Sequence, residues 1–282
     1  MIVDSHCHAW RHWPYSPAVP DPESRGTVEQ LLFELDQNGI DQATIVCARI
    51  DHNPDNNEYV ADAVRRYPDR LHQLADVDCS WAETYHAPGA ARRMAEAIET
   101  YHPKGFTHYV KSDDDGSWYL SDEGLAFLAV AADHHQIASF AIPPRFQATL
   151  RKIAERFPSM PFLCHHMGMA RASEPAPFPL FREIVESARL PNVFVKMSGF
   201  HYVSRQAWEY PFEDCAWVVR GLYEHFGPGR LCWGSDYPVV RRAMTYQHAL
   251  EAFRTHCAFI PEDHRRQILG ENLRQILVRS TG

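Results

Sequence analysis

Several features that mark other protein classes are missing from this chain of 282 residues. Acidic residues outnumber basic ones, 36 to 28, the formal net charge is −8, and there is no basic block. This balance argues against nucleic acid or an anionic membrane surface as a partner. The longest apolar run, 125–132, is far too short to cross a bilayer. We therefore expect a small-molecule substrate, with no nucleic acid and no membrane as partner.

Paired cysteine motifs are missing as well. The seven cysteines are odd in number and scattered, and none forms a C-x-x-C pair. Five of them lie in or beside apolar strand-like runs, where a cysteine behaves as a small buried hydrophobe. No basic region followed by an apolar stretch opens the chain, so no signal peptide is expected. Free thiols and a reducing, cytoplasmic setting are the expectation.

The chain does contain a regular alternation of short β-branched or aromatic runs with helical patterns. The clearest helix is predicted over 27–38, opening with the capping pair Thr27 and Gln30 and closing at Gly39. Eight strands that alternate with helices favour parallel pairing, and eight is the number that closes a barrel. A doubly wound open sheet is the alternative, but no Gly-rich nucleotide loop follows any strand.

We therefore predict an α/β protein, a (β/α)8 TIM barrel that forms a single domain over residues 1–282. Its strands are expected near 2–7, 43–48, 71–77, 105–110, 137–142, 161–165, 193–198 and 231–236. The Pro-rich piece over 14–22 is expected to form a loop above the first strand. Such loops lie at the carboxyl ends of the strands, where barrels build their active sites.

The first predicted strand ends in two histidines, His6 and His8, spaced by two. Side chains at i and i+2 point to the same face of a strand, so the two imidazoles should lie side by side. Such a pair can share a metal ion, or a substrate oxygen and its proton. The alternative is that the two histidines only fill polar positions near a strand end.

Strand ends in a barrel converge even when they are far apart in the sequence. The polar residues at the predicted strand ends are His6, His8, His166, Lys196, Ser198 and Asp236. Because the first and eighth strands are neighbours in a closed barrel, Asp236 is expected beside the histidine pair. The neighbour of His166, His165, is expected to point to the opposite face. Such a cluster can ligate a divalent ion that activates water, or polarise a carbonyl while the carboxylate takes a proton from water.

Other residues that follow predicted strands are candidates for binding substrate. Guanidinium groups form paired hydrogen bonds with carboxylates, although each arginine could equally be a surface charge. Tyr and Trp rings stack on sugar rings or serve as loop packing, and Tyr202 is one such residue. A strand lysine could bind a substrate carboxylate or pair with a neighbouring acid. The substrate-binding candidates are Lys196, Arg49, Arg145, Tyr109, Trp118 and Tyr237.

Four motifs at predicted strand ends resemble the strand 1, 6, 7 and 8 motifs of the amidohydrolase superfamily. They are 4–8 (DSHCH), 164–168 (CHHMG), 195–199 (VKMSG) and 233–238 (WGSDYP). Segments 57–70 (NEYVADAVRRYPDR) and 268–272 (ILGEN) are similar to the amidohydrolase 2 branch. Within that branch, the chain resembles the group of sugar-acid lactonases and 2-pyrone-4,6-dicarboxylate lactonases. The match runs in order over nearly the whole chain.

This resemblance implies a (β/α)8 hydrolase that opens a lactone ring, for example in carbohydrate catabolism. It assigns proton transfer from the attacking water to Asp236 and polarisation of the ring carbonyl to His6, His8 and His166. The strand over 137–142 lacks the terminal histidine of many metal-binding members, so a binuclear centre is not expected. The expected cofactor is none, or one divalent metal, zinc or manganese, held by His6, His8 and Asp236.

Two other functions stay open at this point. One is a metal-dependent decarboxylase or hydratase of the same superfamily, which would need a firmly bound metal and an aromatic or dienoic acid substrate. The other is a barrel that binds sugar acids without catalysis. The oligomeric state is also open, and a homo-oligomer is compatible with the sequence.

Overall fold

The computed structural model describes residues 1–280 and contains one sheet of eight strands in the order β1 to β8. Each strand pairs in parallel with the next. The ring closes where Cys7 forms a parallel bridge with Tyr237, just beyond β8. The predicted (β/α)8 barrel is therefore confirmed. The strands are β1 Val3–Cys7, β2 Gln42–Val46, β3 Leu71–Asp76, β4 Gly105–Tyr109, β5 Ile137–Ala141, β6 Phe162–Cys164, β7 Val193–Met197 and β8 Leu231–Trp233.

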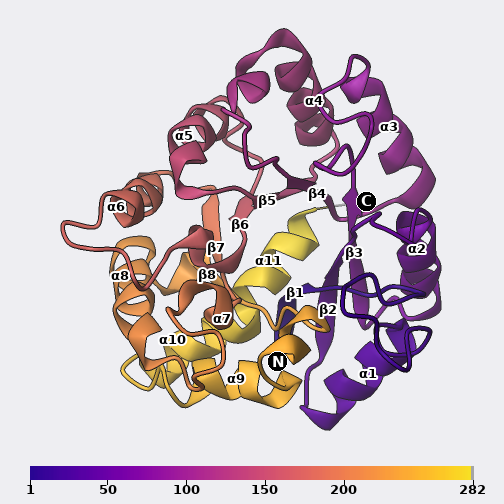
Figure 1. The fold of residues 1–282 in the computed structure, drawn as a ribbon. Coiled ribbons are helices and arrows are strands. Elements are labelled where there is room, and N and C mark those ends of the chain that lie inside the picture. The colour runs from indigo at the N-terminus through magenta and orange to yellow at the C-terminus, as the bar shows by residue number, and fades with distance from the viewer. Residues whose placement is uncertain (281–282) are drawn as a thin grey trace.

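Helices cover the outside of the barrel (Figure 1). The first begins as predicted, because the Thr27 hydroxyl accepts a hydrogen bond from the backbone N–H of Gln30 at 3.3 Å. The helices are α1 Val28–Gln37, α2 Asn56–Arg66, α3 Ala90–Tyr101, α4 Asp122–Asp133, α5 Gln147–Arg156, α6 Pro179–Glu186, α7 Phe200–Val203, α8 Ala216–Phe226, α9 Tyr246–Arg254, α10 Glu262–Arg266 and α11 Asn272–Arg279.

The lower interior of the barrel is closed by apolar side chains. The last helix, α11, runs behind the strands in Figure 1 and packs against their inward-facing residues. We call this group the floor cluster. Its buried members are Val3, Val46, Leu74, Ile137, Leu163, Cys232, Leu273, Ile276 and Leu277. The floor cluster leaves the carboxyl ends of the strands as the end of the barrel where polar side chains gather.

The structure also shows the state of the cysteines and the lengths of the helices. All seven cysteines are buried and none is in a disulfide. Among the described residues, no helix is long and apolar enough to cross a membrane.

Candidate active site

A β-bulge in β1 turns the histidine pair into the barrel. Between Asp4 and Cys7, β1 has one residue more than the facing stretch of β2. Val3 faces the interior as part of the floor cluster, so strict alternation along the strand would turn His6 outward. The extra residue shifts the alternation, and both His6 and His8 face inward.

Asp236 lies opposite three imidazoles. Its Oδ1 atom is 3.4 Å from Nε2 of His6, 3.5 Å from Nε2 of His8 and 3.9 Å from Nε2 of His166. The residue has a left-handed φ of 60°, and its backbone N–H donates to the His6 carbonyl oxygen at 2.7 Å. This bond joins the end of β8 to β1 and places the carboxylate beside the histidine pair.

A second carboxylate, Asp4, accepts hydrogen bonds from both of the segments that meet here, the end of β1 and the residues after β8. Its Oδ1 accepts from the backbone N–H groups of His6 at 3.0 Å and Ser235 at 2.9 Å. Its Oδ2 accepts from the hydroxyls of Ser235 at 2.5 Å and Tyr246 at 2.8 Å. Asp4 is fully buried and faces away from the imidazoles toward α9. It therefore positions the strand ends that carry His6 and Asp236.

Two of the three imidazoles are oriented by acceptors behind them. Nδ1 of His8 is 2.7 Å from the carbonyl oxygen of Val46, so this nitrogen carries the hydrogen and Nε2 has a lone pair. Nδ1 of His166 is 3.1 Å from the Ser198 hydroxyl oxygen, which can accept in the same way. In both residues the nitrogen that faces Asp236 is the one available for chemistry.

Behind the third imidazole lies Lys196, which has no exposed surface. Its Nζ is 3.3 Å from Nδ1 of His6 and 2.7 Å from the hydroxyl oxygen of Ser139. Ser139 in turn is 2.6 Å from Nε2 of His165. Burial lowers the pKa of Lys196 to about 7, against the opposing effect of nearby acids.

Burial also determines the charge of the cluster. It lowers the pKa of His166 to about 4, and burial together with Lys196 lowers the pKa of His6 well below the ordinary 6.5. Burial alone would raise the pKa of Asp236, but the surrounding imidazoles outweigh it and hold that pKa well below 3.8. At neutral pH the site thus contains an ionised Asp236 carboxylate facing the uncharged imidazoles of His6 and His166, and this carboxylate is in the form that can accept a proton.

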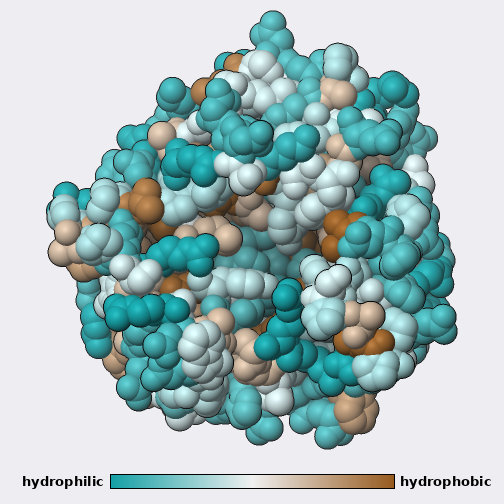
Figure 2. All heavy atoms as spheres, viewed as in Figure 1, coloured by the Kyte–Doolittle hydropathy of each residue, from teal (hydrophilic) through white to brown (hydrophobic). Residues whose placement is uncertain are grey.

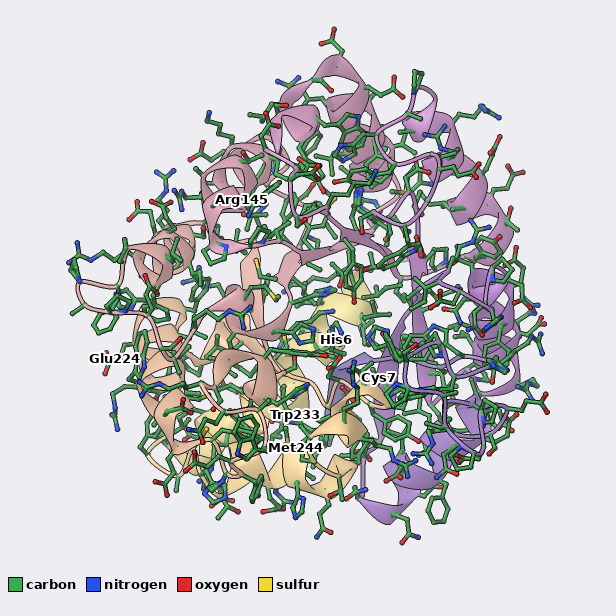
Figure 3. All side chains as sticks on the ribbon, in the orientation of Figure 1. His6, Cys7, Arg145, Glu224, Trp233 and Met244 are labelled. Carbon is green, nitrogen blue, oxygen red and sulfur yellow. The ribbon has the colours of Figure 1, made fainter. Side chains whose placement is uncertain are left out.

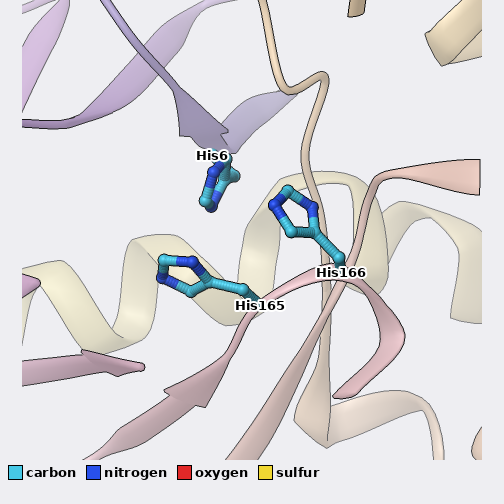
Figure 4. Close-up of side chains that lie close together, drawn as sticks. All are labelled: His6, His165 and His166. Atoms are coloured by element: carbon cyan, nitrogen blue, oxygen red, sulfur yellow. The ribbon is translucent and has the colours of Figure 1, made fainter. Parts of the chain in front are cut away.

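His165 also faces the site, which corrects the expectation that it points away. Its ring centroid is 4.4 Å from that of His6, with the two rings nearly perpendicular, and Figure 4 shows them close together with His166 alongside. The regular alternation continues inward from Leu163 to His165. Because β6 ends at Cys164 and His166 has a φ of 44°, the chain then turns and brings His166 inward as well.

Three tyrosines lie near Asp236: Tyr109 is the last residue of β4, Tyr15 lies in the Pro-rich loop after β1, and Tyr202 lies in α7. The Tyr202 ring centroid is 4.9 Å from that of His166. Burial raises the pKa of each phenol, and the negative charge of Asp236 raises it further. The three hydroxyls therefore stay protonated and can donate to substrate oxygens. Figure 2 shows a hollow at the mouth of the barrel.

The two arginines proposed to bind substrate lie elsewhere. Nε of Arg49 donates to the carbonyl oxygen of Pro54 at 2.8 Å, and Arg145 donates to that of Ser112 at 2.6 Å. Both side chains are exposed. In Figure 3, His6 lies near the barrel axis and Arg145 near the rim. Arg49 stabilises its own loop, and Arg145 joins the segment after β5 to the loop after β4.

Two of the proposed aromatic residues also lie outside the cluster. The Trp118 ring stacks on His86, with centroids 4.2 Å apart. The Tyr237 side chain is buried, and its hydroxyl donates to the carbonyl oxygen of Arg25 at 3.4 Å. Only the backbone of Tyr237 reaches the site, where its carbonyl oxygen accepts from the N–H of His8 at 2.6 Å.

Two residues near the site were not among the sequence-based candidates. Ser139 could have been found, because alternation along β5 places it on the inward face two residues after Ile137. Tyr15 lies in the Pro-rich loop, where no periodicity indicates the direction of a side chain.

The donor atoms of the cluster fit a divalent metal ion. One ligand atom each of His6, His8 and Asp236 lie within 4.8 Å of one another, as do those of His6, His165 and His166. Tetrahedral zinc with bonds of about 2.0–2.2 Å separates its ligand atoms by about 3.4 Å. The distances from Asp236 to His6 and His8 are 3.4 Å and 3.5 Å. His8 also has the carbonyl partner typical of metal-bound histidine, whereas His6 faces a lysine instead.

A parallel barrel with imidazoles and a carboxylate at the carboxyl ends of its strands has the architecture of a water-activating hydrolase. The family model described as amidohydrolase matches residues 3–277, and the chain belongs to this family.

Three similar proteins carry informative names. L-fucono-1,5-lactonase of Burkholderia ambifaria is 27% identical over 284 residues, covering 96% of this chain and 93% of that protein. 4-Sulfomuconolactone hydrolase of Hydrogenophaga intermedia is 31% identical over 244 residues, covering 83% of this chain and 74% of that protein. The crystal structure of an amidohydrolase from Burkholderia multivorans with bound zinc superimposes with a TM-score of 0.78 at 19% identity, covering 99% of each chain.

Proposed function

We propose that the protein hydrolyses the ring ester of a lactone, with a sugar-acid lactone or another carboxylated lactone as the expected substrate class. The observation that carries this proposal is the buried Asp236 carboxylate facing three imidazoles. Two similar proteins that span most of the chain are named as hydrolases of lactones, which supports the same chemistry.

In the proposed mechanism Asp236 takes a proton from the attacking water. Its second oxygen, Oδ2, is buried and has no hydrogen-bond partner among the described residues, so it is available to the water. His6 polarises the ring carbonyl through a hydrogen on Nε2, and the Nε2 lone pairs of His8 and His166 are available to accept hydrogen bonds from the attacking water. The water oxygen bonds to the carbonyl carbon, and the negative charge that develops on the carbonyl oxygen is stabilised by the His6 N–H and tyrosine hydroxyls.

Ring opening then follows from collapse of the tetrahedral intermediate. The bond between the carbonyl carbon and the ring oxygen breaks. The ring oxygen receives the proton held by Asp236 and becomes a hydroxyl, and the new carboxylic acid ionises. One proton is therefore released to solvent for each lactone opened, which makes acid release the natural assay.

His6, His8 and Asp236 are the residues that would hold a divalent metal, zinc or manganese. A metal at this position lowers the pKa of a bound water. We propose that catalysis proceeds without it, because the carboxylate already provides the base, and the His6 N–H and the tyrosine hydroxyls provide the electrophilic groups. The contact between His6 and Lys196 supports this choice, since it is not the environment that a metal-bound histidine normally has.

The test is acid release from a panel of neutral aldonolactones and carboxylated lactones, followed with a pH indicator. Turnover of at least one lactone is expected. Arg145→Ala is the matched control, because Arg145 contacts only loop groups away from the site, and it should keep the wild-type rate. No acid release across the panel would contradict the proposal, and release of CO2 from an aromatic acid would identify a decarboxylase instead.

We also propose that the enzyme works in a reducing compartment, the cytoplasm. Seven buried thiols that form no disulfides support this placement. Whether the chain acts alone or as a homo-oligomer stays a prediction to be measured by light scattering.

A further inference from the structure

The imidazoles that face Asp236 differ in what lies behind them. Behind His8, Nδ1 meets the Val46 carbonyl oxygen at 2.7 Å, a group that only accepts hydrogen bonds. Behind His6, Nδ1 meets Nζ of Lys196 at 3.3 Å, a group that carries hydrogens. Two histidines on one strand end therefore have opposite partners.

Lys196 has enough hydrogens for both of its neighbours. Nζ lies 2.7 Å from the Ser139 hydroxyl oxygen and 3.3 Å from Nδ1 of His6, and the side chain has no exposed surface. Whether the nitrogen carries two hydrogens or three, one can go to Ser139 and one to His6. An imidazole that accepts at Nδ1 has its own hydrogen on Nε2.

We propose that Lys196 is a positioning residue that holds His6 in the tautomer with its hydrogen on Nε2, and so disfavours metal binding by His6. In this tautomer His6 directs an N–H toward Oδ1 of Asp236, 3.4 Å away, and toward a substrate oxygen. His8, fixed in the other tautomer, presents a lone pair. The inference rests on the proposed function only in identifying that substrate oxygen with the lactone carbonyl.

This arrangement has a direct consequence for metal binding. A metal on Nε2 of His6 needs the lone pair of that atom, so the hydrogen would have to move to Nδ1, where it meets Lys196. Metal-bound histidines usually donate their other N–H to a carboxylate or carbonyl, and loss of such a partner weakens metal binding by about 10- to 100-fold. We therefore expect Lys196 to weaken zinc binding by a similar factor.

The first test uses the wild-type protein. With 15N-labelled histidine, long-range 1H–15N spectra distinguish the two neutral tautomers by the shifts of the two ring nitrogens, and loss of a signal set in His6→Gln assigns His6. His6 is expected with its hydrogen on Nε2 and His8 with its hydrogen on Nδ1. A His6 ring with its hydrogen on Nδ1 would overturn the proposal, whatever any variant of Lys196 does.

The second test measures zinc affinity by competition with a fluorescent indicator after chelator treatment. Lys196→Met, which removes the hydrogens and keeps an unbranched side chain, is expected to bind Zn²⁺ about 10- to 100-fold more tightly than wild type. Lys196→Gln offers an amide oxygen that can accept from Nδ1 of a metal-bound His6, so it should also bind zinc more tightly than wild type. Lys152→Met elsewhere on the barrel should bind zinc like wild type. Equal affinities for wild type and the two Lys196 variants would contradict the hydrogen-bond origin.

Neither measurement involves a lactone. Failure of the lactone panel would therefore leave the tautomer of His6 and the zinc affinities to be judged on their own, and failure of this inference would leave lactone hydrolysis untouched.

Discussion

The two ends of the barrel interior use the same strands in opposite ways. In the floor cluster, inward residues such as Leu74 and Ile137 follow the regular alternation of their strands and pack against α11. At the carboxyl end, three of the residues that face one another in the site occur where that alternation is broken. A bulge turns His6 inward, and left-handed backbone brings in His166 and Asp236. Regular strand geometry thus builds the stable part of this barrel, and irregular geometry builds the site.

The irregular end has an energetic cost that the regular end offsets. A non-glycine residue in the left-handed region costs about 1–2 kcal/mol, and such residues follow both β6 and β8. A buried acceptor without a hydrogen-bond partner among the described residues, such as Oδ2 of Asp236, adds to that cost. If this division holds, substitutions at the carboxyl end should lower the catalytic rate with little effect on the free energy of unfolding. Substitutions in the floor cluster should lower the free energy of unfolding with little effect on the rate.

The largest effect on rate is expected from Asp236→Asn. Removing the proton acceptor should lower kcat by about 10²- to 10⁴-fold, the range typical of general acid–base catalysis. Asparagine tolerates the φ of 60° at this position, so the fold should be retained. Steady-state acid release measures the rate, and near-UV circular dichroism checks the fold. A variant with near wild-type kcat would remove Asp236 from its role.

The largest effect on stability is expected from Leu273→Ala in the floor cluster. Leu273 is 1% exposed, and deleting a buried leucine side chain costs about 2–5 kcal/mol of unfolding free energy. The value of kcat at 25 °C should not change. Val278→Ala on the same helix is the control, because Val278 is 67% exposed and should be nearly neutral. Urea unfolding gives both free energies, and a loss of kcat in folded Leu273→Ala would show that the two ends are not separable.

A smaller effect is expected from Gly199→Ala, which acts on the site through a neighbour. The glycine has a φ of +68°, and an added Cβ would lie 2.7 Å from Nδ1 of His166. Because misplacing a catalytic group by about 1 Å can cost on the order of 10²-fold, we expect kcat to fall by about 10- to 100-fold.

Gly39→Ala is the matched control for this substitution. Its φ is +65°, and nothing lies within 4 Å of the added Cβ. Both variants should lose similar stability from backbone strain, about 1–2 kcal/mol, but only Gly199→Ala should lose activity. Equal kcat values for the two variants would contradict the placement of His166.

The smallest effect is expected from Tyr202→Phe. Loss of one hydroxyl that donates to a substrate oxygen should cost about 0.5–1.5 kcal/mol in transition-state binding, or about 2- to 12-fold in kcat/KM. Tyr237→Phe is the paired control, because that hydroxyl contacts the carbonyl oxygen of Arg25 instead of the site. Parallel kcat/KM measurements should separate the two variants. A Tyr237→Phe variant as impaired as Tyr202→Phe would mean that the loss does not come from the site.

The same contrast explains how far the sequence alone could lead. Apolar runs and capping residues obey local periodicity, so the eight strands and the start of α1 could be predicted. Closure of the ring then placed Asp236 near β1 without any local information. That His165 and His166 both face inward could not be found in this way, because strict alternation allows only one of two neighbours to do so, and the second depends on β6 ending at Cys164 and on a left-handed His166.

The contacts of long polar side chains were the least predictable feature of the sequence-based candidates. Arg145 follows a strand, as a substrate-binding residue would, yet it satisfies loop carbonyl groups. Lys196 was expected to bind substrate or pair with an acid, and its position behind His6 depends on three strands meeting in the barrel interior. Such contacts depend on how the elements pack together, and no periodic pattern in the sequence indicates them.

The most direct test of the central claim is the rate of lactone opening by wild-type protein after exhaustive chelation, with bound metal quantified in the same sample. The account predicts that kcat is retained without stoichiometric metal, because Asp236 and the imidazoles supply the chemistry. Activity that disappears on chelation and returns with zinc or manganese would contradict this account and make His6, His8 and Asp236 ligands of an essential metal.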